Sequence, residues 1–232
     1  MTGKRTEDLD DADFAWQRRE MVLEVSAMAE EVSPTIDGTF AISPRVLEAM
    51  GRVLRHQFVP EVERPYAYQN RPLVIGHGQT ISQPYIVALM TDLLKVKAGD
   101  RVLEVGTGSG YQAAVLADLG VEVFSLEIVE ALAKQAEQTL RKLGYNQVHF
   151  MVGDGYHGWQ AQGPFDGVIV TASVSHIPQP LLDQLKPGRR MVIPLGEAYA
   201  PQELVLIEKK EDGSLHKRNV LPVRFVPLTG GH

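Results

Sequence analysis

The chain has 232 residues, 44% of them hydrophobic, and a formal net charge of −6 at neutral pH. This length and composition predict a folded protein with a sizeable core, and the acidic balance argues against a nucleic-acid-binding surface, which would be basic and clustered. The sequence has no run of 18 apolar residues that would span a membrane. It has no cysteine, which excludes disulfides and thiolate metal sites and is typical of a cytoplasmic protein.

The N-terminal part of the chain is predicted to consist of helices joined by ordered loops. Residues 1–13 are polar and acid-rich, so we expect a disordered tail that lacks the apolar segment of a signal peptide. Residues 14–31 have apolar side chains at helical spacing, and Ser43-Pro44 predicts the start of a second helix that ends near residue 56. Residues 58–82, rich in proline, glycine and aromatic residues, are expected to form an ordered loop region before a third helix over 84–94.

From residue 101 onward, short β-type runs alternate with helical runs. This alternation predicts βαβ units and a mostly parallel sheet, and Asp212-Gly213 predicts a hairpin that ends the sheet with an antiparallel pair. We therefore predict an α/β fold, a doubly wound, Rossmann-like sheet with an N-terminal helical extension. A single domain is expected, with a helical and loop region, 14–95, and a cofactor-binding core, 96–232. The predicted strands are 101–105, 121–126, 147–152, 166–171, 189–195, 203–209 and 218–226, and the helices between the first five are 110–119, 128–143 and 178–185.

The most informative motif is Gly106-Thr107-Gly108-Ser109-Gly110, which directly follows the strand 101–105. Glycine permits positive φ angles and lets a ligand approach the main chain closely, and the helix that follows offers free N–H groups. A dinucleotide fingerprint would need a glycine where Tyr111 stands. The spacing therefore disfavours NAD and favours S-adenosylmethionine, whose sulfonium and amino acid part carry no phosphate. Glu104 either adds negative charge beside the glycines or orients the loop backbone.

Two further strand ends carry acidic residues, and ligands of open α/β sheets bind at the carboxyl ends of the strands. Glu127, with Ile128 beside it, stands about 20 residues past the first glycine, where a carboxylate can accept hydrogen bonds from both hydroxyls of a ribose. Asp154 lies between Gly153 and Gly155, which leave space for contact with the exocyclic amine of adenine; the alternative is an ordinary Asx turn. Together these sites describe a bound adenosine with a cationic amino acid tail.

The segment 76–83 precedes a predicted helix N-terminus and contains glycine, histidine, hydroxyl and amide side chains. A helix N-terminus favours negative charge and offers free N–H donors, so this segment is a candidate seat for an acceptor carboxylate. The alternative for Ser82 is a helix N-cap hydroxyl.

These residues resemble the protein L-isoaspartyl (D-aspartyl) O-methyltransferase family over roughly residues 40–229. The glycine turn occurs in many methyltransferases, whereas Gly78-Gln79-Thr80-Ile81-Ser82 is specific to isoaspartyl repair. The matching segments are Phe58-Val59-Pro60, Arg71-Pro72-Leu73, Gly76 to Pro84, Val102 to Gln112, Gly153-Asp154-Gly155, Pro164 to Thr171 and Val223 to Leu228.

The resemblance implies that Ser82 is the active-site serine and that the substrates are isoaspartyl-containing proteins and peptides, with no nucleic-acid or membrane partner. No prediction of oligomeric state follows. Val87 stands where some relatives have a histidine near the cofactor. The residues expected to contact S-adenosylmethionine are Thr80, Ile81, Ser82, Gly106, Thr107, Gly108, Gly110, Glu127, Ile128, Asp154, Gly155 and Thr229.

The acceptor carboxylate, with a pKa near 4, is already ionised at neutral pH, so Ser82 is expected to orient it rather than to attack covalently. Arg224, His77 and backbone N–H groups are candidates to balance its charge, and residues 58–82 and 195–203 are expected to wall the peptide site. The alternatives are a methyltransferase acting on a small molecule or RNA, an NAD-dependent oxidoreductase, and a non-enzymatic module that keeps the cofactor fold.

Overall fold

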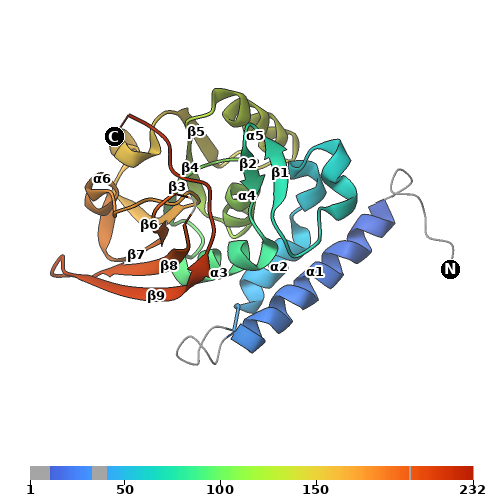
Figure 1. Ribbon diagram of the computed structural model, residues 1–232, viewed down its shortest axis with the longest axis horizontal. Coiled ribbons are helices and arrows are strands. Elements are labelled where there is room, and N and C mark those ends of the chain that lie inside the picture. Colours follow the sequence, from blue (N-terminus) through green and yellow to red (C-terminus); the bar gives the residue numbers. More distant parts are fainter. Residues whose placement is uncertain (1–10, 33–40, 199, 232) are drawn as a thin grey trace.

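A seven-stranded sheet forms the centre of the molecule in the computed structural model, which describes residues 11–32, 41–198 and 200–231 (Figure 1). The strand order is β5-β4-β3-β6-β7-β8-β9; the first five are parallel, and β8 and β9 add antiparallel pairs. The strands are β3 (Arg101–Val105), β4 (Glu122–Glu127), β5 (Val148–Val152), β6 (Phe165–Val170), β7 (Leu185–Leu195), β8 (Gln202–Lys209) and β9 (Leu215–Val223). The predicted fold class is confirmed.

Helices cover both faces of this sheet. One face packs against α3 (Pro84–Leu94), α4 (Tyr111–Asp118) and α5 (Glu130–Lys142), with α1 (Asp11–Val32) and α2 (Pro44–Arg52) outside them (Figure 1). The other face packs against α6 (Gln179–Asp183) and the short 3-10 segments η5 (Gly155–His157) and η6 (Gln160–Gln162). Because both faces are covered, the parallel strands are apolar along most of their length, as their sequences are.

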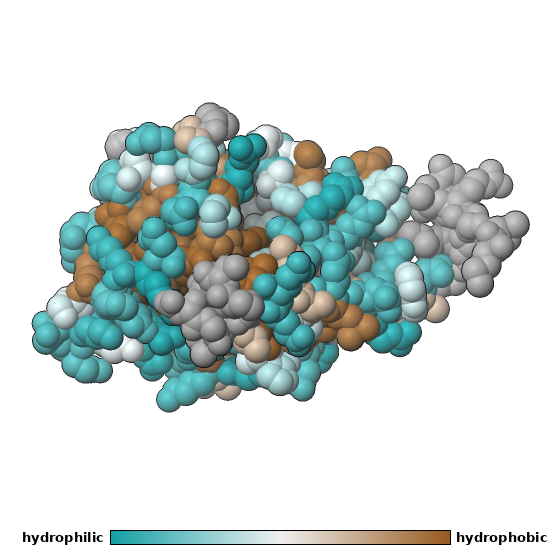
Figure 2. Space-filling model, turned by 60° about the horizontal axis from the view of Figure 1, so that its bottom comes forward, coloured by the Kyte–Doolittle hydropathy of each residue, from teal (hydrophilic) through white to brown (hydrophobic). Residues whose placement is uncertain are grey.

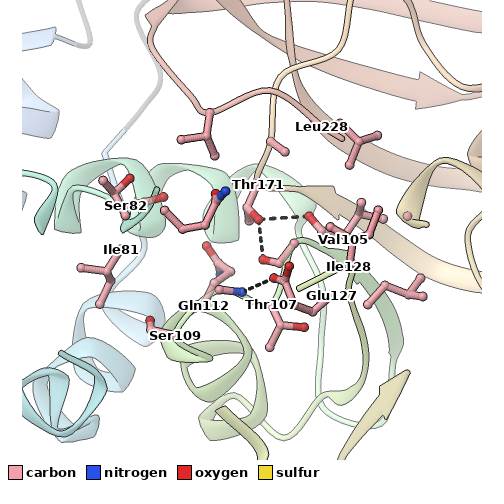
Figure 3. A pocket seen from close by; sticks show the side chains of 18 of the residues that line it. Ile81, Ser82, Val105, Thr107, Ser109, Gln112, Glu127, Ile128, Thr171 and Leu228 are labelled. Carbon is pink, nitrogen blue, oxygen red and sulfur yellow. Dashed lines mark hydrogen bonds between the residues drawn. The ribbon is translucent and has the colours of Figure 1, made fainter. Parts of the chain in front are cut away.

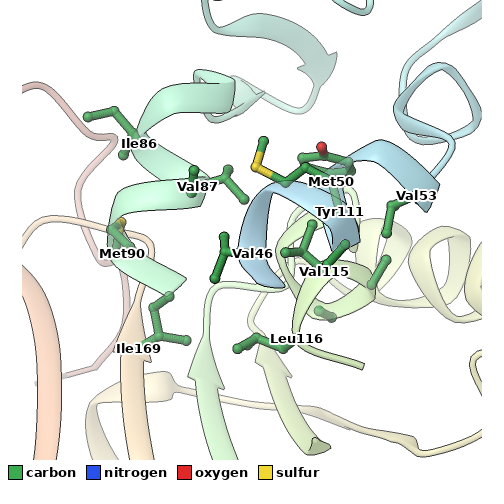
Figure 4. Close-up of a cluster of buried hydrophobic side chains, with 14 of the residues drawn as sticks. Val46, Met50, Val53, Ile86, Val87, Met90, Tyr111, Val115, Leu116 and Ile169 are labelled. Atoms are coloured by element: carbon green, nitrogen blue, oxygen red, sulfur yellow. The ribbon is translucent and has the colours of Figure 1, made fainter. Parts of the chain in front are cut away.

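A hydrophobic cluster joins the N-terminal helices to the sheet. Side chains of α2, α3 and α4 meet there over Ile169 of β6 (Figure 4). Every residue of α3 is buried, so this helix is a core element rather than a surface helix. It begins at the Ser82 corner and therefore holds that corner rigidly against the sheet.

Helix α2 ends at Arg52, four residues before the predicted end, and the 3-10 segment η3 (Arg55–Phe58) follows. Val53 has extended dihedrals (φ −69°, ψ 127°), which turn the chain out of the helix. The side chains of Val53, Arg55, His56 and Phe58 are all buried. At 100° per residue a continuous helix would point them to several sides, so leaving the helix is what lets all four face the core.

The region 58–82 is more regular than the predicted loop. It contains the 3-10 segment η4 (Glu61–Tyr66) and an antiparallel hairpin of β1 (Leu73–Gly76) and β2 (Gln79–Ile81). The three residues at its turn, Gly76, His77 and Gly78, all have positive φ (92°, 52° and 71°). The glycines of the turn are visible in the sequence. The strands on either side were not predicted, because they are only four and three residues long.

The C-terminal hairpin is confirmed, with Gly213 at φ +83° in its turn. Its second strand, however, ends at Val223 rather than at 226, because the chain then leaves the sheet and Pro227 pairs with Ser173 beyond β6. At the N-terminus, α1 begins at Asp11; residues 1–10 of the predicted tail lie outside the described residues.

The described part of the chain contains no helix that is both long and apolar enough to cross a membrane. The face turned forward in Figure 2 is mostly hydrophilic, with hydrophobic residues gathered toward its middle.

Candidate functional site

A pocket lies at the carboxyl ends of β3, β4 and β6, where the sequence predicts a ligand. Figure 3 shows the Ser82 corner on one side of this pocket and Glu127 with Ile128 on the other. The pocket is lined by Gln79 to Ser82, Val87, Val105 to Ser109, Tyr111, Gln112, Leu126 to Ile128, Gly153, Gly155, Thr171, Ala172 and Val226 to Thr229.

The glycine turn forms the floor of the pocket, and its conformation depends on Thr171. Gly106 has φ +97°, and the N–H groups of Gly106 and Thr107 both donate to the carbonyl of Leu126. A Cβ at Gly106 would collide with the Thr171 hydroxyl, which donates to the carbonyls of Val105 (3.0 Å) and Gly106 (2.6 Å). Thr171 therefore requires a glycine at the first position of the turn.

Gly110 differs from the other two glycines. It has φ +88° and precedes α4, and a Cβ there would lie 2.8 Å from Leu140 of α5. Gly110 is not among the lining residues of the pocket. Its visible role is to let the first turn of α4 pack closely on α5, and direct contact with a cofactor stays a prediction for this residue.

Glu127 is held rigidly at the end of β4. One carboxylate oxygen accepts from Gly108 N (2.8 Å) and the other from Val129 N (2.9 Å). The residue is 7% exposed and lines the pocket. Each carboxylate oxygen has a second lone pair, so the anchored carboxylate can still accept hydrogen bonds from two vicinal hydroxyls.

Glu104 lies beneath the turn and contacts it through side chains rather than through the loop backbone. It is fully buried in β3 and accepts a short hydrogen bond from the Ser125 hydroxyl, which in turn lies 2.6 Å from the Thr107 hydroxyl. Burial raises the pKa of Glu104 to about 8. At neutral pH this carboxyl is therefore largely protonated, and it adds little negative charge beside the glycines.

Asp154 closes the far side of the site. Its carboxylate accepts from Tyr156 N (3.0 Å), which is the Asx-turn alternative, and from Gly231 N (3.0 Å). Gly153 and Gly155 line the pocket, but Asp154 does not. A Cβ at Gly155 would strike Val105, so this glycine is needed for the loop to lie against β3. The segment Val226 to Thr229 thus lines the pocket, and Gly231 just beyond it binds Asp154.

The Ser82 corner joins β2 to α3. The N-cap of α3 is Gln83 and Pro84 is its first residue, so the alternative of Ser82 as an N-cap hydroxyl is wrong. Within the described residues the Ser82 hydroxyl has no hydrogen-bond partner, while its carbonyl accepts from buried Arg55 (2.7 Å). The hydroxyl is therefore available to a ligand.

A second groove meets the pocket at this corner. Thr80, Ser82, Thr171 and Val226 line both cavities. The rest of the groove is made by Pro72, Gln83, Ile86, Pro201 and the segment Pro222 to Phe225. Arg224 is thus placed at the groove, whereas exposed His77 lies in the β1–β2 turn and lines neither cavity. Of the segments predicted to wall the peptide site, residues 58–82 contribute Pro72, Thr80 and Ser82 to the groove, and residues 195–203 contribute Pro201.

The charges of the two cavities differ. Glu127 is the one acidic or basic residue among those that line the first pocket, and Arg224 is the one that lines the groove. A pocket with a carboxylate and no cation suits a nucleoside with a positively charged tail and does not balance a pyrophosphate. A groove with a cation suits an anionic acceptor. The residues therefore fit S-adenosylmethionine better than NAD.

Sequence reasoning missed Thr171, Gln112 and the segment Val226 to Leu228 as lining residues. Thr171 follows β6, and β6 pairs with β3, so the predicted parallel sheet offered a signal for it. The residues at 226–228 offered none, because nothing in the local pattern shows that the chain leaves β9 for the pocket.

The family model for protein-L-isoaspartate(D-aspartate) O-methyltransferase matches residues 29–232. The chain is 59% identical over 222 residues to protein-L-isoaspartate O-methyltransferase 2 of Syntrophobacter fumaroxidans, covering 96% of this chain and 90% of that protein. It is 57% identical over 223 residues to protein-L-isoaspartate O-methyltransferase 1 of Cupriavidus necator, covering 96% and 85%.

Solved structures of proteins with the same family name also superpose on this chain. A protein-L-isoaspartate O-methyltransferase structure superposes with a TM-score of 0.79 at 28% identity, over 92% of this chain, which spans 66% of that protein's length. A putative protein-L-isoaspartate O-methyltransferase from Plasmodium falciparum, solved with S-adenosyl-L-homocysteine, superposes with a TM-score of 0.73 at 26% identity, covering 91% of this chain and 98% of that one.

Proposed function

The chain belongs to the protein-L-isoaspartate(D-aspartate) O-methyltransferase family, and we propose how its own residues divide the work of the reaction. The enzyme moves a methyl group from S-adenosylmethionine to the free α-carboxylate of L-isoaspartyl residues in damaged proteins. Such residues form when the backbone at aspartate or asparagine rearranges through a succinimide. The methyl ester then closes to the succinimide without the enzyme, and part of it reopens to normal aspartate.

The donor side of the site is the first pocket. Bound S-adenosylmethionine supplies an electrophilic methyl group on a sulfonium. The Gly106–Gly108 turn allows its main chain to approach the ligand, Glu127 accepts from the ribose hydroxyls, and Gly153 and Gly155, on either side of Asp154, border the adenine. This assignment is supported by the two hydrogen bonds that fix Glu127 and by the absence of a cation among the described lining residues.

The acceptor side begins at Ser82. The isoaspartyl carboxylate is ionised at neutral pH, so the reaction needs alignment and exclusion of water more than it needs a base, and orientation by itself contributes roughly 7–11 kcal/mol in favourable cases. The Ser82 hydroxyl donates to one carboxylate oxygen and presents the other to the methyl group. The observation that carries this proposal is that Ser82 lines both cavities while its hydroxyl has no partner among the described residues.

The substrates are expected to be isoaspartyl proteins and peptides that lie in the groove between Pro72, Pro201 and the segment Pro222 to Phe225. We expect no nucleic-acid partner, because the net charge is −6 and the groove has one cation. A single domain acting in the cytoplasm is also part of the proposal. It is supported by the continuous cluster that joins α1, α2 and α3 to the sheet and by the lack of cysteine.

Methyl transfer from labelled S-adenosylmethionine to matched peptides with isoaspartate or aspartate tests the acceptor. Labelling of the isoaspartyl peptide alone is expected; equal labelling of both would contradict the proposal. The alternative of a small-molecule or RNA acceptor is not favoured by the relatives, and it predicts no labelling of either peptide.

Ser82→Ala tests the role of the serine. Turnover should fall about 10- to 100-fold, in line with loss of one hydrogen bond to a charged group, while affinity for S-adenosylhomocysteine stays within about twofold. Ser175→Ala, an exposed serine that lines neither cavity, is the matched control and should leave both values unchanged. Unaltered turnover in Ser82→Ala would remove this residue from the chemistry.

A further inference from the structure

Arg55 is a fully buried cation directly behind the Ser82 corner. Its Nε donates to the carbonyl of Ala67 (2.8 Å) and its Nη2 to the carbonyl of Ser82 (2.7 Å). The guanidinium carbon lies 4.6 Å from the centre of the Tyr111 ring. The third nitrogen, Nη1, is buried and has no hydrogen-bond partner in the described part of the chain.

No described carboxylate lies within ion-pair distance of this guanidinium, whereas the partly exposed Arg101, Arg189 and Arg190 each form an ion pair with a carboxylate. Burial lowers the pKa of Arg55 to about 10, so the group stays charged at neutral pH. A buried charge without a counter-ion is costly, and the two carbonyls and the aromatic face compensate it only in part. A net positive charge is therefore held inside the protein.

The charge is placed at the junction of the two cavities. Ser82 lines both of them (Figure 3), and Tyr111, whose ring covers the guanidinium, lines the donor pocket next to the glycine turn. The Ser82 hydroxyl oxygen is four covalent bonds from the carbonyl oxygen that Arg55 binds. With about 2.8 Å for each hydrogen bond, an anion bound at the hydroxyl would lie on the order of 7 Å from the guanidinium.

We propose that Arg55 is the positioning residue that makes this enzyme select an ionised carboxylate: it fixes the Ser82 corner through its carbonyl and supplies the positive charge that the acceptor anion meets. The other cation near the site, Arg224, is exposed, so solvent and salt screen it. A buried charge acts through a lower dielectric. The inference rests on the proposed placement of the acceptor at Ser82.

The test compares binding of an isoaspartyl peptide with that of its carboxamide analogue, in which the α-carboxylate is replaced by a neutral amide. Both are titrated into enzyme saturated with S-adenosylhomocysteine. Coulomb's law at about 7 Å and an effective dielectric constant of about 20 gives roughly a 50-fold preference for the anion. Arg55→Met should reduce the carboxylate-to-carboxamide affinity ratio by at least about tenfold and leave carboxamide affinity within about threefold of wild type.

Arg45→Met is the matched control. The Arg45 guanidinium also donates to two backbone carbonyls, those of Val96 (2.8 Å) and Leu119 (2.6 Å), but it is exposed and lies at the far ends of α3 and α4. This variant should keep the wild-type ratio. A purely structural role for Arg55 would weaken binding of both peptides equally, and an unchanged ratio in Arg55→Met would overturn the proposal.

Arg55→Lys decides the matter if the methionine variant does not fold. A buried lysine has a lowered pKa, so the preference for the carboxylate should be present at pH 6.5 and decline toward pH 9, while the wild-type ratio stays level. A carboxylate-to-carboxamide ratio in Arg55→Lys that is no higher than in Arg55→Met (or than about a tenth of the wild-type ratio, where Arg55→Met does not fold) at any pH from 5.5 to 9 would count against the charge. These are binding ratios, so they remain separable from the turnover measured in Ser82→Ala.

Discussion

Gly106→Ala is the most direct test of the glycine turn, because two separate strains meet at this residue. Its φ of +97° lies where a side chain is rarely tolerated. In addition, the new Cβ would collide with the Thr171 hydroxyl, which donates to the carbonyls of Val105 and Gly106. Relief of the collision requires Thr171 to rotate away and give up this interaction with both carbonyls.

The expected loss of stability is the sum of these two effects. A non-glycine residue in the left-handed region costs about 1–2 kcal/mol. The Thr171 hydroxyl has one proton, which it shares between the two carbonyls, and loss of this hydrogen bond costs about 0.5–1.5 kcal/mol. Together they predict a decrease of about 2.5 kcal/mol in the free energy of unfolding, and for a chain of this size such a decrease lowers Tm by roughly 5–10 °C. Affinity for S-adenosylhomocysteine should fall as well, since the turn forms the pocket floor.

Gly144→Ala separates the two effects. Gly144 has a similar φ of +86°, but a Cβ there meets nothing within 4 Å. This control should lose only the backbone contribution, about 1–2 kcal/mol, and keep its cofactor affinity. Urea unfolding and calorimetric titration of both variants provide the comparison. If Gly106→Ala loses no more stability than Gly144→Ala, the contact with Thr171 does not constrain the turn and the reasoning is wrong.

Three further changes probe the acidic residues. The raised pKa of Glu104 means that the folded state keeps a proton which the unfolded chain releases, so wild-type stability should fall by a few kcal/mol as pH rises from about 4.5 to 8. Urea unfolding of Glu104→Gln should show a weaker dependence of stability on pH. An equal pH dependence in wild type and variant would refute a protonated Glu104. Glu127→Gln should weaken S-adenosylhomocysteine binding roughly 10- to 100-fold, because an amide has one acceptor oxygen where the carboxylate has two charged ones. Calorimetric titration measures this affinity, and an unchanged value would exclude the ribose contact. Asp154→Asn should release the C-terminal segment, since an amide cannot accept from both Tyr156 N and Gly231 N, and faster hydrogen exchange at Gly231 would report it.

The sequence by itself determined the parallel core and the donor pocket. Buried parallel strands are apolar on both faces, so β3, β4 and β6 are visible as short apolar runs. The glycine turn and Glu127 follow such runs directly, and the carboxyl ends of parallel strands meet at one edge of a sheet. Local pattern and topology therefore agree, and the structure brings Gly106, Glu127 and Gly155 to one pocket.

The limits of α2 and the hairpin in 58–82 depend on more than local pattern. Residues 53–58 have a sequence that a helix accepts, but Arg55, His56 and Phe58 all become buried against other elements, and this overrides helical propensity. The β1–β2 strands are too short to give a period. In both places long-range packing selects the backbone.

Only the tertiary structure decided which groups meet at the site. Thr171 faces Gly106 across 65 residues, Arg55 reaches the Ser82 carbonyl across 27, and Gly231 binds Asp154 across 77. A single hydrogen bond leaves no periodic trace in sequence, because its donor and acceptor belong to elements whose approach is fixed by the packing of the whole core. Residue types and strand ends can be predicted from the chain, whereas the buried charge behind Ser82 exists only once the helices have closed around it.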